Sequence, residues 1–425
     1  MKILIVGGGG REHALAWKAA QSGTDKVYVA PGNAGTALEP ALENVPIAAN
    51  DVAGLLHFAQ REGIDLTIVG PEAPLVLGIV DTFQAANLKC FGPTREAAQL
   101  EGSKAFCKDF LARHKIPTAE YRSFIDVEPA IAYIREKGAP IVVKADGLAA
   151  GKGVVVAQTE DEAISAVQDM LAGDAFGTAG HRVVIEEFLS GEEASFIVMA
   201  DGTHALAMAS SQDHKARDEG DTGPNTGGLG AYSPAPVVTA DIHRRTLEEV
   251  ILPTLRGMAA DGIPYTGFLY AGLMILPDGS IKVLEFNCRF GDPETQPIMM
   301  RLQSNLPQLC LAALDGRLDT VETQWDPRPA LGVVMAAGGY PFDHAQGDVI
   351  HGLPALDAGD TKVFHAGTAL AGGEVVTAGG RVLCVTALGD SVADAQEKAY
   401  AVVRQISWNG AYYRRDIGHR AIGRG

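Results

Sequence analysis

Short apolar runs alternate with amphipathic helical stretches over the first hundred residues of the chain. Four apolar runs have the length of buried strands and lie at residues 3–6, 27–30, 66–69 and 88–91. Helical patterns separate them, for example at residues 11–20 and 52–62. Because strands that alternate with helices are typical of parallel sheets covered on both faces, this region predicts a doubly wound parallel α/β domain.

Turn residues follow each of these four predicted strands. They are rich in Gly, Pro and Asn and lie at residues 7–10, 31–33, 70–72 and 92–94. The carboxyl ends of parallel strands open onto one edge of the sheet, where ligands bind. We therefore expect a ligand pocket at this edge.

The middle of the chain predicts mixed α+β structure. Predicted strands lie at residues 141–144, 154–157, 183–187, 195–199 and 205–209, around a helix at 161–171. A longer helix at 239–260 and a hairpin of residues 267–276 and 281–286 follow. Residues 210–236 are mostly Gly, Asp, Thr, Pro and Asn, which predicts a long loop of the kind that is functional or disordered.

The last hundred residues predict a small α+β unit, in which we identify no catalytic constellation. Its strands are expected at residues 331–336 and 381–388, and its helix at 392–405. The predicted divisions are an N-terminal α/β domain, a small lobe with a glycine-rich flap, a large lobe with a metal site and a C-terminal domain: residues 1–103, 104–190, 191–325 and 330–425.

Composition narrows the classes of partner. The formal charge is −17, from 35 Lys and Arg against 52 Asp and Glu, which disfavours a nucleic-acid or anionic-membrane surface. The five cysteines show no CxxC spacing, which favours a reducing compartment. No signal peptide or long apolar stretch is recognisable, so we expect a cytoplasmic location.

The glycine cluster at residues 7–10 does not complete a dinucleotide-binding motif. Glu12 stands where the last glycine of GxGxxG is required, and no acidic residue follows the second strand to hold a ribose. These features disfavour a nicotinamide oxidoreductase. They leave a helix N-terminus beside Arg11 and His13 as a site for a phosphate monoester, with a tight turn and a solvated arginine as the alternative.

Residues 147–153 are similar to a phosphate-binding P-loop but have the wrong spacing. Only three residues separate the glycines, and Gly153 replaces the Ser or Thr that binds magnesium. We interpret the segment as a glycine-rich flap whose amides and Lys152 close over ATP phosphates. Lys144 ends an apolar run and is expected to meet an anion, unless it is a surface lysine.

Two further segments carry candidate nucleotide and metal ligands. The strand at 183–187 leads to Phe188 and Leu189, which are expected near an adenine edge, with Glu193 at the ribose hydroxyls. Glu285 and Asn287 alternate on one strand, so they share a face. Their hard oxygen donors suit Mg²⁺ bound to phosphates.

Taken together, the motifs resemble the glycinamide ribonucleotide synthetase family of the ATP-grasp ligases. The resemblance covers essentially the whole chain and rests on these blocks: GGGREHA at 8–14, VGPE at 69–72, KADGLAAGKG at 144–153, DTGPNTGG at 221–228, EFNCRFGDPETQ at 285–296 and GVVMAAGGYP at 332–341. One departure is Gly272, where many ATP-grasp enzymes carry an additional magnesium carboxylate.

The resemblance implies an ATP-dependent ligation of de novo purine biosynthesis. ATP phosphorylates the carboxylate of glycine, and the amine of 5-phosphoribosylamine attacks the resulting glycyl phosphate, giving glycinamide ribonucleotide, ADP and phosphate. The expected cofactors are ATP and Mg²⁺ or Mn²⁺. We expect small-molecule substrates, no nucleic-acid or membrane partner, and a monomer or weak dimer.

The resemblance also suggests roles for individual residues. The catalytic candidates are Lys144, Arg289 and Asp213, and the metal ligands are Glu285 and Asn287. The ATP-binding candidates are Lys104, Lys144, Lys152, Gly153, Glu186, Glu187, Phe188, Leu189 and Glu193. The substrate-binding candidates are Gly9, Gly10, Arg11, Glu12, Pro71, Glu72, Lys215, Asn225, Thr226, Gly227 and Arg289, with His214 expected beside Asp213 and Lys215 at the interface between ATP and phosphoribosylamine.

Two other functions stay open on the sequence. One is an ATP-grasp ligase that acts on a different carboxylate and amine. The other is a noncatalytic nucleotide-binding protein, which would bind ATP without consuming it.

Overall fold

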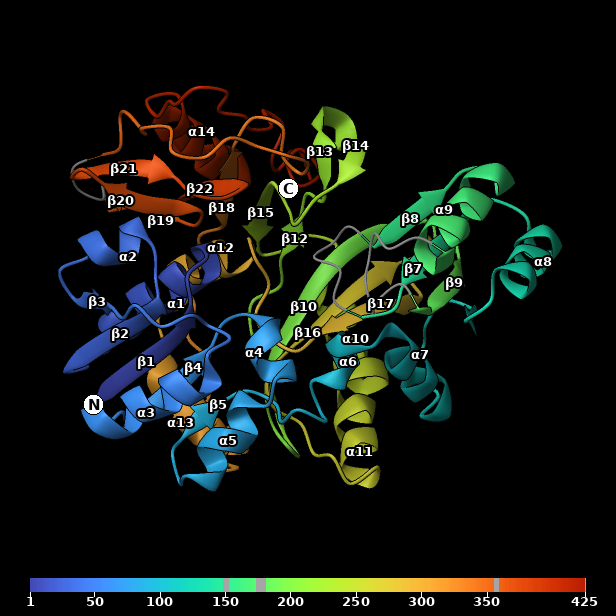
Figure 1. Cartoon of the computed structure of the whole chain (residues 1–425), viewed down its shortest axis with the longest axis horizontal. Coiled ribbons are helices and arrows are strands. Elements are labelled where there is room, and N and C mark those ends of the chain that lie inside the picture. Colours follow the sequence, from blue (N-terminus) through green and yellow to red (C-terminus); the bar gives the residue numbers. More distant parts are fainter. Residues whose placement is uncertain (148–152, 173–180, 355–358, 425) are drawn as a thin grey trace.

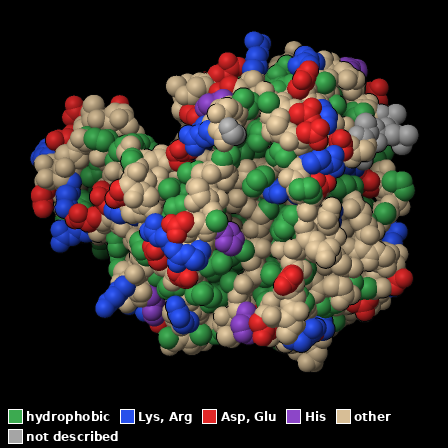
Figure 2. Space-filling model, turned by 180° about the vertical axis from the view of Figure 1, so that it is seen from behind, with side chains coloured by type: hydrophobic (Ala, Val, Ile, Leu, Met, Phe, Trp, Pro, Cys, Tyr) green, Lys and Arg blue, Asp and Glu red, His purple; other side chains and the backbone are tan. Residues whose placement is uncertain are grey.

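The computed structural model describes residues 1–147, 153–172, 181–354 and 359–424 (Figure 1). Among the helices in these ranges, none combines the length and apolar character that spanning a bilayer requires. The N-terminal domain, two central lobes and a C-terminal part surround the middle of the molecule (Figure 1). Seen from behind, the small lobe projects from the rest of the molecule (Figure 2).

The N-terminal domain contains the predicted parallel sheet. Its strand order is β3-β2-β1-β4-β5, with β1 (Lys2–Gly7), β2 (Lys26–Pro31), β3 (Leu42–Asn44), β4 (Leu66–Val69) and β5 (Cys90–Phe91). Its helices are α1 (Gly10–Ala20), α2 (Ala34–Leu38), α3 (Val52–Glu62), α4 (Glu72–Val76) and α5 (Ile79–Ala85). Alternate residues of β1 enter two cores: Ile3 and Ile5 pack in one, and Leu4 and Val6 in the other. The doubly wound prediction is confirmed.

The limits of helix α3 follow from its end residues. The side chain of Asp51 accepts a hydrogen bond from the Gly54 N–H at 2.9 Å, which satisfies a free amide of the first turn. Gly63 ends the helix with φ of +65°, a conformation that glycine adopts without steric cost. The predicted range, residues 52–62, is the observed one.

The small lobe is a four-stranded antiparallel sheet with two helices. Helices α6 (Gln99–Gly102) and α7 (Lys104–Arg113) lead into it from the N-terminal domain. Its strand order is β6-β9-β7-β8, with β6 (Tyr121–Phe124), β7 (Ile141–Ala145), β8 (Val154–Ala157) and β9 (Val183–Glu187). Helices α8 (Val127–Lys137) and α9 (Glu160–Ala172) share its core. The chain between β7 and β8 is the predicted flap, of which residues 148–152 lie outside the described residues.

The large lobe is built on a second antiparallel sheet of order β11-β10-β16-β17. Its strands are β10 (Glu192–Asp201), β11 (Ala205–Ala207), β16 (Thr266–Ile275) and β17 (Ile281–Asn287). Helices α12 (Thr295–Arg301) and α13 (Leu306–Leu314) follow, and a short 3-10 turn spans Leu318–Thr320.

The helix predicted at 239–260 has three parts. Helix α10 (Ala240–Thr246) and helix α11 (Leu252–Ala260) are joined by a π-helical turn at Leu247–Ile251. Pro253 lies at the start of α11 and has no N–H to donate to the preceding turn. The regular helical hydrogen bonding is therefore interrupted at this point, although the chain stays helical.

The composition of residues 210–236 predicted a long loop, but the structure has short strands and a turn there. The segment contains β12 (Gln212–Asp213), β13 (Ala216–Asp218), a 3-10 turn at Glu219–Asp221, β14 (Thr222–Asn225) and β15 (Gly230–Ser233). These strands are too short and too rich in Gly and Pro to show a period of two. One of them, β15, pairs with β18 (Ala330–Ala336), which is distant in sequence, and β12 pairs in turn with β15.

The C-terminal sheet incorporates those two strands. Its order is β12-β15-β18-β22-β19, with β18 (Ala330–Ala336), β19 (Thr361–His365) and β22 (Arg381–Leu388). Helix α14 (Val392–Val403) packs on β18 and β22, and β20 (Thr368–Ala371) pairs with β21 (Glu374–Thr377). One sheet thus includes residues on both sides of the predicted boundary between the large lobe and the C-terminal domain, at residues 325–330.

Three phenylalanine rings join the N-terminal domain to the large lobe. The ring centroids of Phe91 and Phe268 lie 4.9 Å apart, and those of Phe268 and Phe290 lie 4.8 Å apart, both with edge-to-face geometry. All three side chains are buried. Such pairs contribute beyond the area that they bury.

Replacing Phe268 by alanine should destabilise this junction. We expect Phe268→Ala to lower the free energy of unfolding by about 3–5 kcal/mol, because a large buried ring leaves a cavity. The measurement is the shift of the urea unfolding transition that involves the N-terminal domain. Phe342→Ala is the control, since Phe342 is 61% exposed and its loss should change stability by at most about 0.5 kcal/mol. Equal shifts in the two variants would contradict the assignment of the junction.

Candidate active site

A cavity of about 650 Å³ lies where the four parts of the molecule meet. Each part contributes to its lining: Glu72 from the N-terminal domain, Lys144 from the small lobe, Glu285 from the large lobe and Arg381 from the C-terminal sheet. Concave sites between domains are the usual places for small ligands. The chemistry of the lining changes from one region of the cavity to another.

One region of the cavity is apolar and lies between the two lobes. Its side chains come from β7 and β8 of the small lobe, from β16 and β17 of the large lobe, and from the segment after β9: Val142, Val154, Val156, Met274, Leu284, Phe286, Phe188 and Leu189. Leu189 is buried and Phe188 is exposed. Apolar walls on two sides suit a flat heteroaromatic ring.

Lys144 lies beside this apolar region and is buried. Its Nζ lies 2.9 Å from Oε1 of Glu186, whose other carboxylate oxygen lies 2.8 Å from Nζ of Lys108. Burial alone would lower the pKa of Lys144, but attraction by Glu186 and Glu285 raises it above the ordinary value. Lys144 is therefore a charged group inside the cavity, and the alternative of a surface lysine is wrong.

Lys104 is a second cation in this region. Helix α7 begins at Lys104, and the side chain of Ser103 accepts a hydrogen bond from the Phe106 N–H at 3.1 Å to cap it. The Lys104 Nζ donates to the carbonyl of Gly147 at 2.7 Å, at the start of the flap. Burial lowers the pKa of Lys104, which an incoming anion would reverse.

Glu285 and Asn287 of β17 both line the cavity, as their spacing predicted. Burial alone would raise the pKa of Glu285, but Lys215, Lys144 and Lys104 lower it overall, so the carboxylate is ionised. A carboxylate and an amide oxygen on one strand face fit a divalent cation. Gly272 lies opposite Glu285 in the β16–β17 register and offers no side-chain ligand.

Arg289 is held by two carboxylates of the N-terminal domain. Its Nη2 lies 2.9 Å from Oε1 of Glu101, and its Nε lies 3.3 Å from Oε2 of Glu72. Among the described residues, its ion pairs are with these two carboxylates and not with Asp292 or Glu294, which are closer in sequence. Burial raises the pKa of Glu101 to about 7, although Arg289 opposes this.

Arg11 also lines the cavity, whereas the glycines before it support the loop. The Arg11 Nη1 donates to the Phe290 carbonyl at 3.2 Å. The Glu12 carboxylate accepts from the Gly9 N–H at 2.6 Å, so it caps α1 rather than facing a substrate. A Cβ atom at Gly10 would lie 2.5 Å from Nε2 of Gln296, which explains a glycine in that close approach.

His13 lies away from the cavity. Its Nδ1 accepts a hydrogen bond from the His365 N–H at 2.9 Å, and its Nε2 lies 3.3 Å from Glu39. The imidazole therefore belongs to the contact with the C-terminal part of the chain. The idea that His13 assists Arg11 at a phosphate is not supported by its position.

The segment at residues 212–216 alternates across the cavity wall. Asp213 and Lys215 line the cavity, and the Lys215 Nζ lies 2.7 Å from Oε2 of Glu193. His214 is buried on the opposite side, so its expected place beside the substrates is wrong. Burial raises the pKa of Asp213 to about 7; nearby Glu294 and Glu193 also raise it, and Lys215 opposes them.

The C-terminal part contributes residues that the sequence did not indicate. Arg381 lines the cavity, and its Nη1 donates to the carbonyls of Gly227 at 2.7 Å and Asp292 at 2.6 Å. Tyr340, whose hydroxyl accepts from the Gly227 N–H at 3.0 Å, and His344 also line it. Arg381 opens an ordinary strand pattern, so no local signal marked it.

The structure gathers most of the predicted site residues at this one cavity. Those lining it are Arg11, Pro71, Glu72, Lys104, Lys144, Gly153, Glu186, Glu187, Phe188, Leu189, Glu193, Asp213, Lys215, Asn225, Thr226, Gly227, Glu285, Asn287 and Arg289. Gly9, Gly10 and Glu12 are not in its lining, and Lys152 lies outside the described residues. The lining also includes charged and polar residues that were missed: Glu101, Lys108, Tyr270, Asp292, Glu294 and Arg381.

Models of one protein family match most of the chain. The model of the phosphoribosylglycinamide synthetase N domain matches residues 1–101, that of its ATP-grasp (A) domain matches residues 102–295, and that of its C domain matches residues 330–420.

The chain is also similar to known proteins along its whole length. It is 70% identical over 427 residues to the phosphoribosylamine–glycine ligase of Yersinia pestis, with 100% of both chains covered. The crystal structure of the phosphoribosylamine–glycine ligase from Thermotoga maritima has a TM-score of 0.85 at 33% identity, covering 98% of this chain and 100% of that one. A biotin carboxylase domain from Hydrogenobacter thermophilus, at 15% identity and a TM-score of 0.74, covers 97% and 91% and shares the fold.

These matches agree with the resemblance seen in the sequence blocks, and they extend over all parts that line the cavity. The chain belongs to the phosphoribosylglycinamide synthetase family, with an ATP-grasp domain between the family's N and C domains.

Proposed function

We propose that this chain ligates glycine to 5-phosphoribosylamine at the expense of ATP, releasing glycinamide ribonucleotide, ADP and phosphate. The observation that carries the proposal is one cavity that joins an apolar region, buried lysines beside two hard oxygen donors, and a cluster of arginines. The relatives at 70% identity are phosphoribosylamine–glycine ligases, which supports the choice of substrates.

ATP would bind between the two lobes. The apolar region accepts the adenine ring, with the backbone near Phe188 and Leu189 at its edge, while Glu186 and Glu187 form the adjoining wall. Glu193 would accept hydrogen bonds from ribose hydroxyls. Lys104 and Lys144 lie where they can neutralise the phosphates, and the flap with Lys152 and Gly153 would cover them.

Glu285 and Asn287 are the proposed ligands for Mg²⁺ or Mn²⁺. Such a cation, when bound, reduces the charge of the phosphates. Glu285 keeps its negative charge because three lysines surround it. We expect the positive charges of Lys104, Lys144 and Lys215 also to reduce the net negative charge of the cavity before a ligand binds.

Phosphoribosylamine would bind toward the N-terminal domain. Arg11 would pair with its 5-phosphate, and Pro71 and Glu72 would contact the ribose, with Glu72 accepting from hydroxyl groups. Asn225, Thr226 and Gly227 border the same cavity and would complete this subsite. In this arrangement the unit at residues 1–103 holds the amine substrate, and the lobes at 104–190 and 191–325 hold ATP.

The chemistry needs positioning more than a covalent nucleophile. A carboxylate oxygen of glycine attacks the γ-phosphorus of ATP, and the bond from that phosphorus to ADP breaks. The amine of phosphoribosylamine then attacks the carbonyl carbon of glycyl phosphate, and phosphate leaves with the electrons of the carbon–oxygen bond. Arg289 is placed to hold the glycine carboxylate or the transferring phosphoryl group.

The attacking amine must lose a proton, and Asp213 is the proposed acceptor. Its carboxyl group lines the cavity, and its pKa of about 7 is close to that of an efficient general base at neutral pH. Lys215, next to it on the cavity side, stays charged because Glu193 and Asp213 outweigh the effect of burial on its pKa. Because acyl phosphates hydrolyse readily, the enclosure between the lobes also protects the intermediate.

An omission experiment tests the function. We expect ADP release only when ATP, glycine, a divalent cation and phosphoribosylamine, formed in place from ribose 5-phosphate and ammonia, are all present. Steady ADP release without glycine would contradict the proposal, and replacement of glycine by another carboxylate with equal rate would favour the alternative ligase. ATP binding with no turnover under any condition would favour the noncatalytic alternative.

Lys144→Ala should greatly reduce turnover and leave the fold intact. Removing a cation that faces the phosphates should lower kcat by about 100-fold to 1000-fold, the range typical of a lost electrostatic contact to a transition state. Lys137→Ala is the matched control in the same lobe, because Lys137 is on the surface and pairs with Glu120. Wild-type rates in Lys144→Ala would remove Lys144 from the site.

The pH dependence of kcat should reveal Asp213. A general base acts only when deprotonated, so activity should rise as the pH increases through about 7 and fall below it. Asp213→Asn should lower kcat by about 100-fold to 10,000-fold and abolish this rise. Initial rates over pH 5.5 to 9, with ATP binding followed in parallel, provide the measurement. An unchanged acidic limb in Asp213→Asn would exclude Asp213 as the base.

A further inference from the structure

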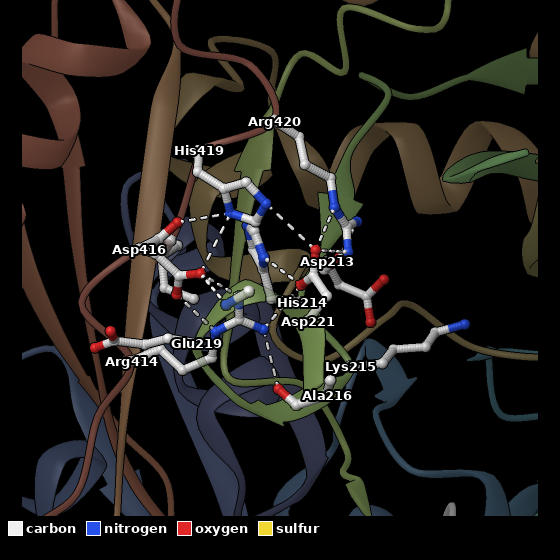
Figure 3. Close-up of polar contacts among 12 residues, drawn as sticks. Asp213, His214, Lys215, Ala216, Glu219, Asp221, Arg414, Asp416, His419 and Arg420 are labelled. Carbon is white, nitrogen blue, oxygen red and sulfur yellow. Dashed lines mark hydrogen bonds and ion pairs between the residues drawn. The ribbon is translucent and has the colours of Figure 1, made fainter. Parts of the chain in front are cut away.

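The end of the chain reaches the back of the strand that carries Asp213 and Lys215. Residues 412–420 follow α14 and return to the region of β12 and β13 (Figure 3). In this view the Asp213 and Lys215 side chains extend to the right, away from Arg414 and His419, and Arg420 lies above Asp213 (Figure 3).

The contacts follow the strand almost residue by residue. The Arg420 Nη1 donates to the Asp213 carbonyl at 3.3 Å, and the Gly418 N–H donates to the His214 Nε2 at 3.0 Å. The Arg414 Nη1 donates to the Ala216 carbonyl at 3.0 Å, and the Tyr412 hydroxyl donates to the Arg217 carbonyl at 2.7 Å. Within residues 213–217, Lys215 alone takes part in none of these four bonds, and its side chain faces the cavity.

Asp221 holds the two arginines in place. Its Oδ1 lies 3.0 Å from the Arg414 Nη1, and its Oδ2 lies 2.8 Å from the Arg420 Nη2. Asp416 also pairs with Arg414, at 2.7 Å, and accepts from the Gly220 N–H at 2.8 Å. These ion pairs allow the buried guanidinium group of Arg414 and the half-buried one of Arg420 to bond to backbone carbonyls without leaving their charges unpaired.

The histidines near Asp221 do not form a cation site. His214, Asp221 and His419 lie close enough to share an ion. However, the lone pair of the His214 Nε2 is used by the Gly418 N–H, and both oxygens of Asp221 already face guanidinium groups. Two adjacent positive charges would repel a metal ion. The cluster is therefore a set of contacts between protein segments.

His214 must be neutral for these contacts. Its Nε2 accepts a hydrogen bond, so the ring hydrogen belongs on Nδ1, which lies 3.4 Å from Oδ1 of Asp221. Burial lowers the pKa of His214 to about 4, and Arg420 and Arg414 oppose its protonation as well. A neutral ring with one acceptor and one donor ties the strand both to the C-terminal segment and to Asp221.

The C-terminal segment is itself anchored to α14. The Tyr400 hydroxyl donates to the Arg414 carbonyl at 2.6 Å, and the Gln396 Nε2 donates to the Ile417 carbonyl at 2.8 Å. Arg414 is fully buried. The contacts on the strand therefore lead to a helix of the C-terminal domain rather than to a free chain end.

We propose that Tyr412, Arg414, Gly418 and Arg420 are positioning residues for the reaction, which hold the strand at 213–217 so that Asp213 and Lys215 point into the cavity. Two contacts are central: Arg420 bonds to the carbonyl of Asp213, and the Gly418 N–H bonds to the His214 side chain on the face of the strand opposite the cavity. The inference rests on the proposed function, because it gives the C-terminal domain a part in that reaction. Small displacements of groups that position reactants lower rates strongly.

The test compares Arg420→Met, Arg420→Lys and Arg415→Met in the full chain. Arg415 is the matched control, since it is exposed in the same segment and, among the described residues, its side chain has no hydrogen bond or ion pair. We expect Arg420→Met to lower kcat by about 10-fold to 100-fold, with partial recovery in Arg420→Lys and wild-type behaviour in Arg415→Met. The dissociation constant of ATP, measured by calorimetry, should stay unchanged because Lys104, Lys144 and the apolar region belong to other segments of the chain and take part in none of these four contacts.

A second pair of variants keeps the test decisive if Arg420→Met does not fold. His214→Gln retains an acceptor near Nε2, whereas His214→Leu does not, so kcat should be partly kept in the first and reduced in the second. Wild-type kcat in folded Arg420→Met or His214→Leu would overturn the inference. It would also be overturned if the loss of kcat were matched by an equal loss of ATP affinity, as a general structural defect predicts. If the wild-type chain shows no glycine-dependent ADP release, the proposed function itself fails.

Discussion

The ion pairs of Arg289 with Glu101 and Glu72 are the interaction on which the site depends. Arg289 follows β17, whereas the two carboxylates come from helices α6 and α4, so the pairs connect the large lobe with the N-terminal domain. A buried guanidinium that lost these partners would be strongly unfavourable, which restricts how the two parts can be placed. Phe290, the next residue, packs edge-to-face on Phe268. Phe268 in turn packs on Phe91 across the same junction.

The cavity collects positive side chains although the chain as a whole is negatively charged. The chain carries a formal charge of −17, but phosphates and carboxylates must be bound. Positive side chains are therefore collected at one place, and carboxylates such as Glu186 and Glu285 keep them compatible with burial. An anionic substrate can replace part of the ion pairing that these carboxylates provide to the lysines. This is possible because the electrostatic potential in the cavity depends on charged groups within a few ångströms rather than on the net charge of the chain.

The C-terminal domain participates through its sheet. Strands β12 and β15 belong to the C-terminal sheet, although they lie in the sequence of the large lobe. Their pairing in this sheet brings Arg381 to the cavity and places residues 412–420 behind Asp213. This arrangement explains why a domain without a recognisable catalytic motif is part of the site. Its contribution is geometric: it provides one cation, Arg381, and contacts the back of the strand that carries Asp213.

The sequence by itself determined the elements whose signals are local. The parallel sheet of the N-terminal domain, helix α3 with its two end residues, strands β8 and β9 and the Glu285–Asn287 pair follow from periodicity, capping and side-chain alternation. The family blocks also contain 18 of the 39 residues that line the cavity. These features are predictable because each depends on neighbours within a few residues.

Tertiary structure alone decided the rest. Among the short strands in residues 210–236, β15 pairs with β18, which lies about a hundred residues away in sequence, and β12 pairs with β15. The Glu12 carboxylate bonds to the Gly9 N–H, so that of these residues only Arg11 lines the cavity. His214 faces away from the cavity because successive side chains of an extended segment point to opposite sides. Arg381 and Glu101 reach the site from distant segments. These roles are set by the burial of each group and by the charges that the fold places around it. Neither can be predicted from a local sequence pattern.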